Sequence, residues 1–178
     1  IKREKKRVLH EIDFTINEGD YVALVGNNGA GKSSLMRLMT GLVKQESGEV
    51  LVAGNDTKRT SPEFLAELVT YIHQNPEQMF IDDSVQKDIG FYMKARKIPH
   101  YEARVQELME QFELVELRQR DSRLLSGGQQ RRASLAIGVG MNPEIMLLDE
   151  PTANLDIATR KHISRFLDQL KHQLKAVV

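Results

Sequence analysis

Residues 24–41, LVGNNGAGKSSLMRLMTG, place three glycines and a lysine between an apolar run and a helical pattern. Gly26, Gly31, Lys32 and Ser33 match the pattern G-x-x-x-x-G-K-[ST]. Glycines let the backbone N–H groups of such a turn point inward around an anion, because no Cβ atom obstructs them. The helix start adds partial positive charge. The stretch therefore predicts a phosphate-binding turn between a buried strand and a helix.

A glycine-rich turn with a surface lysine is the alternative. It is disfavoured because a chance match to four fixed positions is expected in on the order of 1% of chains of this length. Under the phosphate interpretation, Lys32 reaches the β and γ phosphates of a nucleotide and the Ser33 hydroxyl binds Mg²⁺.

Two acids follow the second strongly apolar run, EIMLLDE. In a parallel sheet, ligands gather outside the carboxyl ends of the strands. Asp149 is then suited to hold Mg²⁺, and Glu150 is suited to orient and polarise an attacking water. The simpler alternative makes both acids favourable charges at the start of a helix.

The remaining periodicity predicts an α/β protein with a parallel sheet. Alternation at Ile12, Phe14 and Ile16 predicts a half-buried strand, and further strands are expected in YVALVG (21–26), GEVLVAGND (48–56), VTYIHQ (69–74), EIMLLDE (144–150) and the final AVV (176–178). Helical spacing is found in Leu35, Leu38, Met39 and Leu42, and again in Ile163, Phe166, Leu167, Leu170 and Leu174. Since AVV resembles the beginning of a strand, we expect the polypeptide to be trimmed or to continue.

Composition narrows the function classes. The chain has 178 residues, enough for one domain, and its 25 Lys and Arg balance 25 Asp and Glu. No broad basic surface for nucleic acid is therefore expected, and the KREKK stretch (2–6) is interpreted as solvated. Without cysteine, disulfides and thiolate metal sites are excluded. No apolar run approaches the roughly 18 residues of a membrane span, so any work at a membrane requires a partner.

A second glycine cluster occurs in LSGGQQRR (125–132). Ser126 and Gln129 fit a capping box at the start of a helix, and Gly127 and Gly128 leave backbone N–H groups free for an anion. One ATP needs only one such cradle, so the second cradle suggests a different nucleotide. Gly138 and Gly140 weaken the helix that follows by roughly 1 kcal/mol each relative to alanine, for which the sequence offers no reason.

With these motifs in this order, the chain resembles the ATP-binding cassette (ABC) ATPases. The phosphate turn GNNGAGKSS, Gln74 in the place of the Q-loop glutamine, the LSGGQQRR signature, the acids of IMLLDEPT and the D-loop ANLD together carry the resemblance. It implies a P-loop NTPase (RecA-like) parallel core with an N-terminal antiparallel β part and a helical insertion. We expect one nucleotide-binding domain over 1–178, with 1–83 and 124–178 as the ATPase core and 84–123 as a helical subdomain.

The resemblance also implies a head-to-tail dimer that encloses two Mg-ATP molecules. The expected ATP-binding residues are Gly26, Asn27, Asn28, Gly29, Ala30, Gly31, Lys32, Ser33 and Ser34 of one subunit with Ser126, Gly127, Gly128 and Gln129 of the other. The expected catalytic residues are Glu150, Gln74 and Lys32, and the expected Mg²⁺ ligands are Ser33, Gln74 and Asp149. Asp156 is expected in the D-loop at the subunit boundary.

A finer resemblance lies in QNPEQMF (74–80) and DSVQKDIGF (83–91). These segments look like the ATPases of energy-coupling factor transporters and related cobalt importers, which take up vitamins or metal ions. The implied protein is peripheral, on the cytoplasmic face of the cell membrane, and acts with a second ATPase subunit and integral membrane subunits. The alternative is that Met79, Phe80 and Ile81 are ordinary core residues beneath the loop.

The sequence disfavours three other classes of ABC protein. A soluble ABC protein acting on nucleic acid with a long coiled coil is excluded, because only residues 75–124, a count of 50, separate Gln74 from Leu125. Ribosome-binding members carry two cassettes joined by a charged linker, which is not visible here. Lys32 and Glu150 argue against a cassette that binds nucleotide without hydrolysing it.

Two family features have no counterpart in the chain. No aromatic residue stands where the family stacks one on adenine, and no histidine stands where the family places its switch histidine. The five histidines are His10, His73, His100, His162 and His172. We therefore expect this stretch alone to hydrolyse ATP poorly.

Overall fold

The computed structural model describes residues 8–153, 155–170 and 174–178. KREKK, Asn154 of the expected D-loop and His172 lie outside these ranges. In chain order the elements are α1 (Lys32–Met39), β1 (Leu51–Val52), β2 (Asn55–Asp56), α2 (Pro62–Leu68), β3 (Val69–Ile72), η1 (Pro76–Met79), α3 (Val85–Ala95), α4 (Tyr101–Gln111), η2 (Val115–Leu117), η3 (Ser122–Leu124), α5 (Gly127–Gly140), β4 (Ile145–Leu148), α6 (Ile157–Leu170) and β5 (Ala176–Val177).

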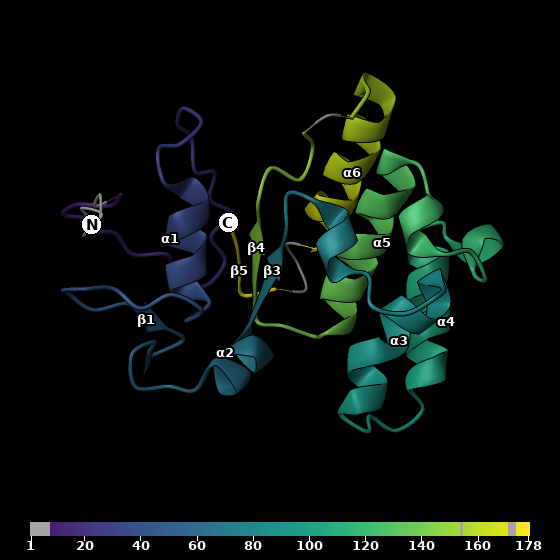
Figure 1. The fold of residues 1–178 in the computed structure, drawn as a ribbon, viewed down its shortest axis with the longest axis horizontal. Helices are drawn as coiled ribbons and strands as arrows, with labels where there is room; N and C mark the ends of the chain where they lie inside the picture. The colour runs from purple at the N-terminus through teal and green to yellow at the C-terminus, as the bar shows by residue number, and fades with distance from the viewer. Residues whose placement is uncertain (1–7, 154, 171–173) are drawn as a thin grey trace, which may run out of the picture.

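A parallel sheet in the order β3-β4-β5 forms the centre of the fold (Figure 1). Val69 is paired with Ile145 and Ile72 with Leu148, so β3 and β4 end at the same edge of the sheet. Tyr21 extends the sheet by a single parallel bridge to Val177. β5 therefore separates the segment before the phosphate turn from β4. The strands predicted in VTYIHQ, EIMLLDE and AVV are confirmed, and β1 and β2 form a short antiparallel pair within GEVLVAGND.

Two predicted strands are wrong. Residues 12–16 form no strand, and within 21–26 only Tyr21 is bridged. Val22 N–H donates to the Val177 carbonyl over 2.8 Å, but β5 is only two residues long and offers the residues after Val22 no continuing ladder. Val25 is consequently 94% exposed rather than buried. A run of apolar residues becomes a strand only where a neighbouring backbone pairs with it.

The two faces of the sheet carry cores of different size. Met146 and Leu148 of β4 belong to a large cluster shared with α3, α4, α5 and α6, whereas Leu147 belongs to a small cluster with Met36 of α1 and Leu65 of α2. Figure 1 shows α1 on one side of the sheet and α5 and α6 on the other. β4 is thus buried on both faces, as its continuous apolar sequence predicts.

The two glycines of α5 that the sequence left unexplained lie where the helix approaches its neighbours. An added Cβ at Gly138 would lie 2.3 Å from Ile72 Cδ1 of β3. At Gly140 it would lie 3.2 Å from both Leu108 Cδ1 of α4 and Met93 Cε of α3. Glycine therefore allows α5 to pack closely against the sheet and against the two helices of the insertion, which offsets its low helix propensity.

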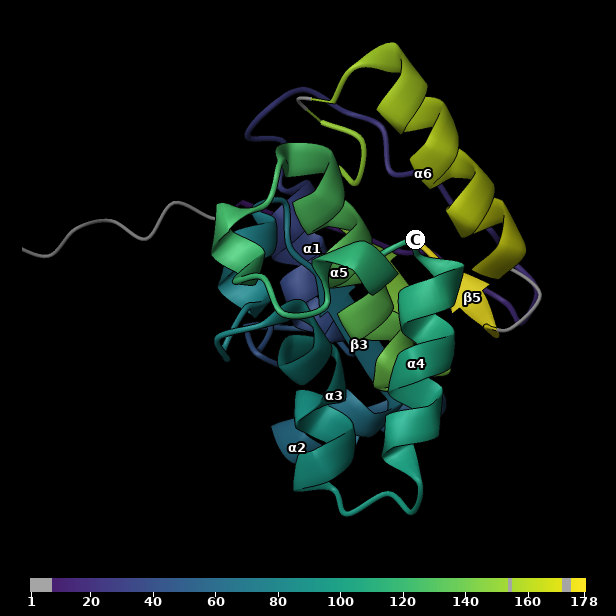
Figure 2. The ribbon, with the colours of Figure 1, turned by 90° about the vertical axis from the view of Figure 1, so that its right-hand side faces the viewer.

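Residues 84–123 contain α3, α4, η2 and the first two residues of η3, and they contain no strand. Figure 2 shows α3 and α4 side by side next to α5, and the three helices pack together. The limits of the expected core and helical subdomain remain a prediction. Throughout the described ranges, no helix has the length and apolar character required to cross a membrane.

Candidate functional site

The phosphate turn is an open loop that leads into α1. Gly29 and Gly31 have φ values of +83° and +101°, in the region that favours glycine. Lys32 Nζ donates to the carbonyls of Gly26 and Asn27 over 2.8 and 3.3 Å, so its ammonium group closes the loop from inside. No side chain caps the N-terminus of α1. The first-turn N–H groups of α1 therefore remain available to an anion.

Most of the residues of this turn are accessible. Gly26, Asn27, Asn28, Gly29 and Ala30 are exposed, and Gly31, Lys32, Ser33 and Ser34 are half-buried. A Cβ at Gly31 would lie 2.8 Å from Leu9 Cδ2, which shows that the N-terminal segment passes directly over the end of the turn.

Lys32, Asp149 and Glu150 line one cavity of about 240 Å³. Its walls come from the segment before the turn, the start of α1, the end of β4 and the end of β5. The cavity is smaller than the roughly 300–1,000 Å³ of a typical ligand pocket. It is therefore the inner part of a site that opens toward solvent.

The side chain of Gln74 joins this group of residues. Gln74 Nε2 donates to Glu150 Oε2 over 2.8 Å, although 76 positions separate the two residues. Glu150 has a φ of +48°, an unusual conformation for a residue other than glycine. Such strain is concentrated at functional positions. The ends of β3 and β4 thus place the predicted Q-loop glutamine on the predicted catalytic acid.

Tyr71 is a site residue that sequence reasoning missed. Its hydroxyl donates to Asp149 Oδ2, and Asp149 N–H donates to the Ile72 carbonyl over 3.0 Å. Burial, followed by the hydrogen bond to Asp149, raises the pKa of Tyr71 from 10.0 to about 12. The tyrosine therefore stays protonated and orients one carboxylate oxygen. Nothing in the residues around Tyr71 indicated this role, because its partner Asp149 lies 78 positions away in the sequence.

The donor set suits a magnesium nucleotide. Mg²⁺ is usually held by one or two protein ligands together with water and substrate phosphates, and the Ser33 hydroxyl and Asp149 carboxylate are ligands of this kind. No group of three or more His, Cys, Asp or Glu within the described ranges forms a self-sufficient metal site. Ser33 and Asp149 therefore suit a Mg²⁺ ion whose remaining ligands are phosphate oxygens and water.

The second glycine cluster has the predicted capping box. The Ser126 side chain accepts from Gln129 N–H over 3.4 Å, and Gln129 Oε1 accepts from Ser126 N–H over 3.0 Å. Ser126 and Gly127 are exposed, and an added Cβ at Gly127 would meet nothing within 4 Å. α5 therefore presents its N-terminus to solvent on the opposite side of the sheet from α1 (Figure 1).

Gly128 connects this cluster to the expected D-loop. A Cβ at Gly128 would lie 2.8 Å from Thr159 Cγ2 of α6. Thr159 donates through N–H and Oγ1 to the two oxygens of Asp156 over 2.9 and 2.6 Å. These bonds lower the pKa of Asp156, with the side-chain bond from Thr159 as the main cause. The carboxylate of Asp156 is therefore held ionised next to the signature turn.

Arg131 is a second residue that sequence reasoning missed. It lies on α5, is 3% exposed, and donates to the carbonyls of His73 and Gln74. Nearby, burial lowers the pKa of His73, with Arg37 as a further cause, so this imidazole is neutral at pH 7. Arginine after a glycine turn is common on helix surfaces, so its burial here could not be foreseen.

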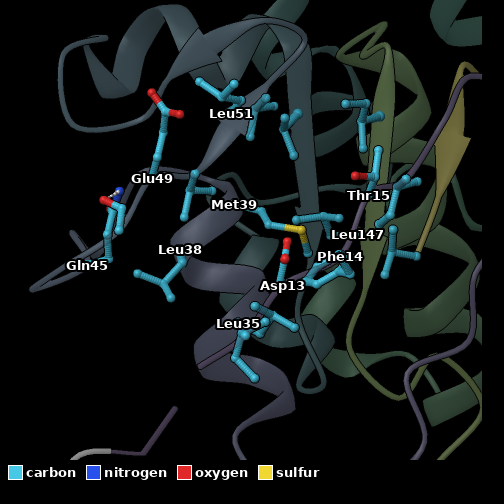
Figure 3. Close-up of a pocket in the computed structure, with 18 of the residues that line it drawn as sticks. Asp13, Phe14, Thr15, Leu35, Leu38, Met39, Gln45, Glu49, Leu51 and Leu147 are labelled. Atoms are coloured by element: carbon cyan, nitrogen blue, oxygen red, sulfur yellow. Dashed lines mark hydrogen bonds between the residues drawn. The ribbon is translucent and has the colours of Figure 1, made fainter. Parts of the chain in front are cut away.

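A second, larger cavity lies away from these groups. It has a volume of about 1430 Å³ and is bounded by the N-terminal segment, α1, β1 and the sheet (Figure 3). Figure 3 shows Leu35, Leu38 and Met39 of α1 facing it, and none of the predicted site residues lines it. Size alone therefore does not identify the nucleotide site.

The structure thus brings together one set of predicted residues and leaves a second set apart. Lys32, Gln74, Asp149 and Glu150 meet at one edge of the sheet. Ser126, Gly127, Gly128, Gln129 and Asp156 gather at α5 and α6. Of the residues with two interpretations, Phe80 is 6% exposed and belongs to the core, whereas Ile81 is 49% exposed.

The chain is similar to several known proteins. The profile of the family described as ABC transporter matches residues 9–153. The energy-coupling factor transporter ATP-binding protein EcfA1 of Mycoplasmoides gallisepticum is 36% identical over 98% of this chain and 63% of its own length. EcfA of Enterococcus faecium is 32% identical over 96% and 62%. The chain therefore spans less than two thirds of the length of these relatives.

Two solved structures share the fold. One is cbiO1 from Clostridium perfringens, described as part of the ABC transporter complex cbiONQ, with a TM-score of 0.81 and 27% identity over 96% of this chain and 70% of that one. The other is the ATP-binding cassette MJ0796 bound to ADP and Pi, with a TM-score of 0.83 and 24% identity over 99% and 82%.

Proposed function

The chain belongs to the ABC transporter family, and on this premise we propose that it is the ATP-binding and ATP-hydrolysing part of an importer of the energy-coupling factor type. One observation carries the proposal: Lys32, Asp149 and Glu150 line the same cavity, and Gln74 is hydrogen-bonded to Glu150. These four side chains come from three separate segments of the chain: the start of α1, the end of β3 and the end of β4. A charged group, two acids and an amide meeting at one sheet edge favour catalysis on a phosphate ester.

The phosphate turn binds the nucleotide. N–H groups of residues 26–34 surround the β and γ phosphates, and Lys32 exchanges its two loop carbonyls for phosphate oxygens. Ser33 and Asp149 would hold Mg²⁺, and the bound ion would supply positive charge that neutralises the phosphates. Tyr71 fixes the orientation of Asp149 during this step.

Glu150 directs hydrolysis. Its carboxylate accepts a hydrogen bond from water and orients that water toward the γ phosphate. The bond from Gln74 Nε2 restricts the carboxylate to one direction and links it to the segment that follows β3. Lys32 offsets the negative charge that accumulates as the phosphate leaves.

The signature cluster serves a second nucleotide. Because the N-terminus of α5 and the phosphate turn lie on opposite sides of the sheet, one chain cannot close both around the same ATP (Figure 1). In a head-to-tail pair, Ser126, Gly127 and Gly128 of each subunit cover the ATP held by the other. Loss of the γ phosphate removes this contact, so the pair opens.

We propose that the transported solute is a vitamin or a metal ion and that integral membrane subunits carry it. Two supports are the names of the EcfA relatives and the description of cbiO1 as part of the cbiONQ complex. The protein is then peripheral to the membrane, on its cytoplasmic face.

The test uses the Glu150→Gln substitution in the full-length protein. The amide keeps the shape of the side chain but cannot polarise water, so ATP binding persists while hydrolysis falls roughly 100- to 10,000-fold. Since ATP is no longer consumed, the Glu150→Gln protein accumulates as a dimer with Mg-ATP. Phosphate release and size-exclusion chromatography measure both effects.

Glu144→Gln is the matched control. Glu144 precedes β4 at its opposite end and forms an ion pair with exposed Lys175 over 3.1 Å. Hydrolysis and sizing of Glu144→Gln should match the wild-type protein. A Glu150→Gln protein that hydrolyses ATP normally, or that stays monomeric with Mg-ATP, contradicts the proposed function.

A further inference from the structure

Arg131 forms a two-pronged contact with the segment after β3. Its Nη1 donates to the His73 carbonyl over 2.8 Å and its Nη2 to the Gln74 carbonyl over 2.6 Å. The side chain is almost completely buried, and Nε has no hydrogen-bond partner in the part of the chain that is described. A buried charge that satisfies two consecutive backbone carbonyls fixes the position of that backbone.

The geometry requires arginine. A planar guanidinium presents parallel N–H groups that can reach two carbonyls at once, whereas a lysine ammonium is a point charge on a flexible stem. Burial lowers the pKa of Arg131 and the nearby charge of Asp149 opposes this effect, so the guanidinium stays charged between the two acceptors.

The two ends of this contact belong to different functional groups. On one side, the Gln74 backbone that Arg131 holds carries the amide bonded to Glu150. On the other, Arg131 lies four residues after Gly127, which places it roughly 6 Å along the helix axis from the signature turn. Arg131 therefore connects the first turns of α5 to the backbone of Gln74.

The same segment is also held at its far end. Asp88 of α3 accepts from the N–H groups of Ile81 and Asp82 over 2.7 and 2.8 Å and from Ser122 Oγ over 2.6 Å. Gln130, the neighbour of Arg131, donates to the Ser122 carbonyl over 3.3 Å. Residues 73–82 are thus hydrogen-bonded at one end to α5 and at the other end to Asp88, which Ser122 and Gln130 connect to α5.

We propose that Arg131 is a positioning residue that couples the two ATP sites of the dimer. This inference rests on the proposed function. In each subunit, closure of the signature turn on the partner's ATP shifts α5, and Arg131 transmits the shift to Gln74 and so to Glu150 in the subunit's own site. Hydrolysis at one site then depends on occupancy of the other.

The test measures ATP hydrolysis against ATP concentration in the full-length dimer. Arg131→Met removes both hydrogen-bond donors at similar side-chain volume. Arg131→Lys keeps the positive charge but loses the two parallel N–H donors of the guanidinium. For Arg131→Met we expect a nearly unchanged KM, a kcat lowered roughly 10- to 100-fold by misplacement of Gln74, and a Hill coefficient that falls to about 1. Arg131→Lys should lie between Arg131→Met and the wild-type protein.

Arg132→Met is the matched control, because Arg132 is the next residue of α5. It donates to the Phe112 and Glu113 carbonyls instead, over 3.2 and 3.1 Å. It should lower the unfolding temperature comparably and leave the Hill coefficient at its wild-type value. Equal losses of kcat and cooperativity in Arg131→Met and Arg132→Met would show a merely structural role for Arg131 and overturn the inference.

A double-mutant cycle covers the case in which Arg131→Met folds poorly. If Arg131 acts through Gln74, the effect of Arg131→Lys on kcat disappears in a Gln74→Ala background. Full additivity would overturn the inference while leaving the proposed function intact. A wild-type dimer that neither binds nor hydrolyses ATP would instead contradict the proposed function, and with it the inference.

Discussion

The two glycine turns resemble each other in sequence and differ in construction. The first glycine turn leads into α1, in which Met36 is the only buried residue and which has no side-chain cap. Val25, just before this glycine turn, is 94% exposed. The second glycine turn leads into α5, in which ten of fourteen residues are buried and the N-terminus has a complete capping box. The first turn is therefore loosely supported by the protein, and the second is rigidly supported.

This difference separates two ways of binding an anion. The uncapped first turn leaves its N–H groups and Lys32 to the ligand, so nucleotide completes its structure. The second turn already uses Gln129 N–H in a long bond to Ser126, and Arg131 and Gly128 tie it to the rest of the domain. The first glycine turn is thus open to a ligand, whereas the second is a firmly packed part of the domain.

The largest expected effect is on the first turn. Lys32→Ala removes two charge-assisted contacts to phosphate, so ATP affinity should fall by roughly 100-fold or more, as measured by calorimetric titration. Saturating Mg-ATP should stabilise the wild-type protein by about 2.7 kcal/mol at 100 times Kd and leave Lys32→Ala almost unaffected. Because Lys32 contacts only loop carbonyls, the nucleotide-free variant should unfold like the wild-type protein. If Lys32→Ala bound ATP with wild-type affinity, the first glycine turn would not depend on its ligand in the way that we infer from its open structure.

An intermediate effect is expected at the second turn. Gly128→Ala places a Cβ 2.8 Å from Thr159 Cγ2, and Thr159 is held by Asp156, so we expect a loss of about 1 kcal/mol or more from overpacking. Gly127→Ala meets open space and should raise helix stability by up to about 1 kcal/mol. Urea unfolding without nucleotide measures both changes.

Thr159→Ser sharpens this experiment. It removes Cγ2 but keeps the hydroxyl bond to Asp156, so it should restore most of the stability lost in Gly128→Ala. If Gly127→Ala and Gly128→Ala destabilise equally, the close contact with α6 does not distinguish these two positions.

The smallest effect is expected from Tyr71→Phe. Loss of the hydrogen bond to Asp149 should reduce stability by about 1 kcal/mol at pH 7. The pKa of Tyr71 is raised from 10.0 to about 12, so this stabilisation is fully present below pH 10 and is lost as the pH rises toward 12. The difference between the two proteins should therefore be constant from pH 7 to about 9 and shrink above pH 10. Urea unfolding at each pH tests this, and a difference that grows above pH 10 would contradict it.

Much of the site was predictable because its signals are local. The spacing of Gly26, Gly31 and Lys32, and the cap formed by Ser126 and Gln129, involve residues fewer than ten positions apart. Similarly, the apolar run before Asp149 predicts a strand buried on both faces, and β4 is such a strand. The strand predicted from the apolar run of 21–26 does not form, because backbone pairing with β5 stops after Val22.

What could not be predicted depends on how distant segments pack. Nothing in the neighbourhood of Arg131 or Tyr71 distinguishes it from an ordinary helix or strand residue, and each acquires its partner only when β3, β4 and α5 are assembled. The same holds for Gly138, because the reason for a glycine at this position is the close contact between α5 and Ile72.

The amino-acid sequence by itself therefore predicted two anion cradles, and it determined the pair of acids after a buried strand and the order in which these motifs occur. Only the tertiary structure decided which carbonyls Arg131 reaches, which acid Tyr71 orients, and that the two cradles lie on opposite sides of one sheet. Turn and cap chemistry is set by neighbouring residues along the chain. Contacts across the sheet are set by register and close packing, which no short stretch of sequence encodes.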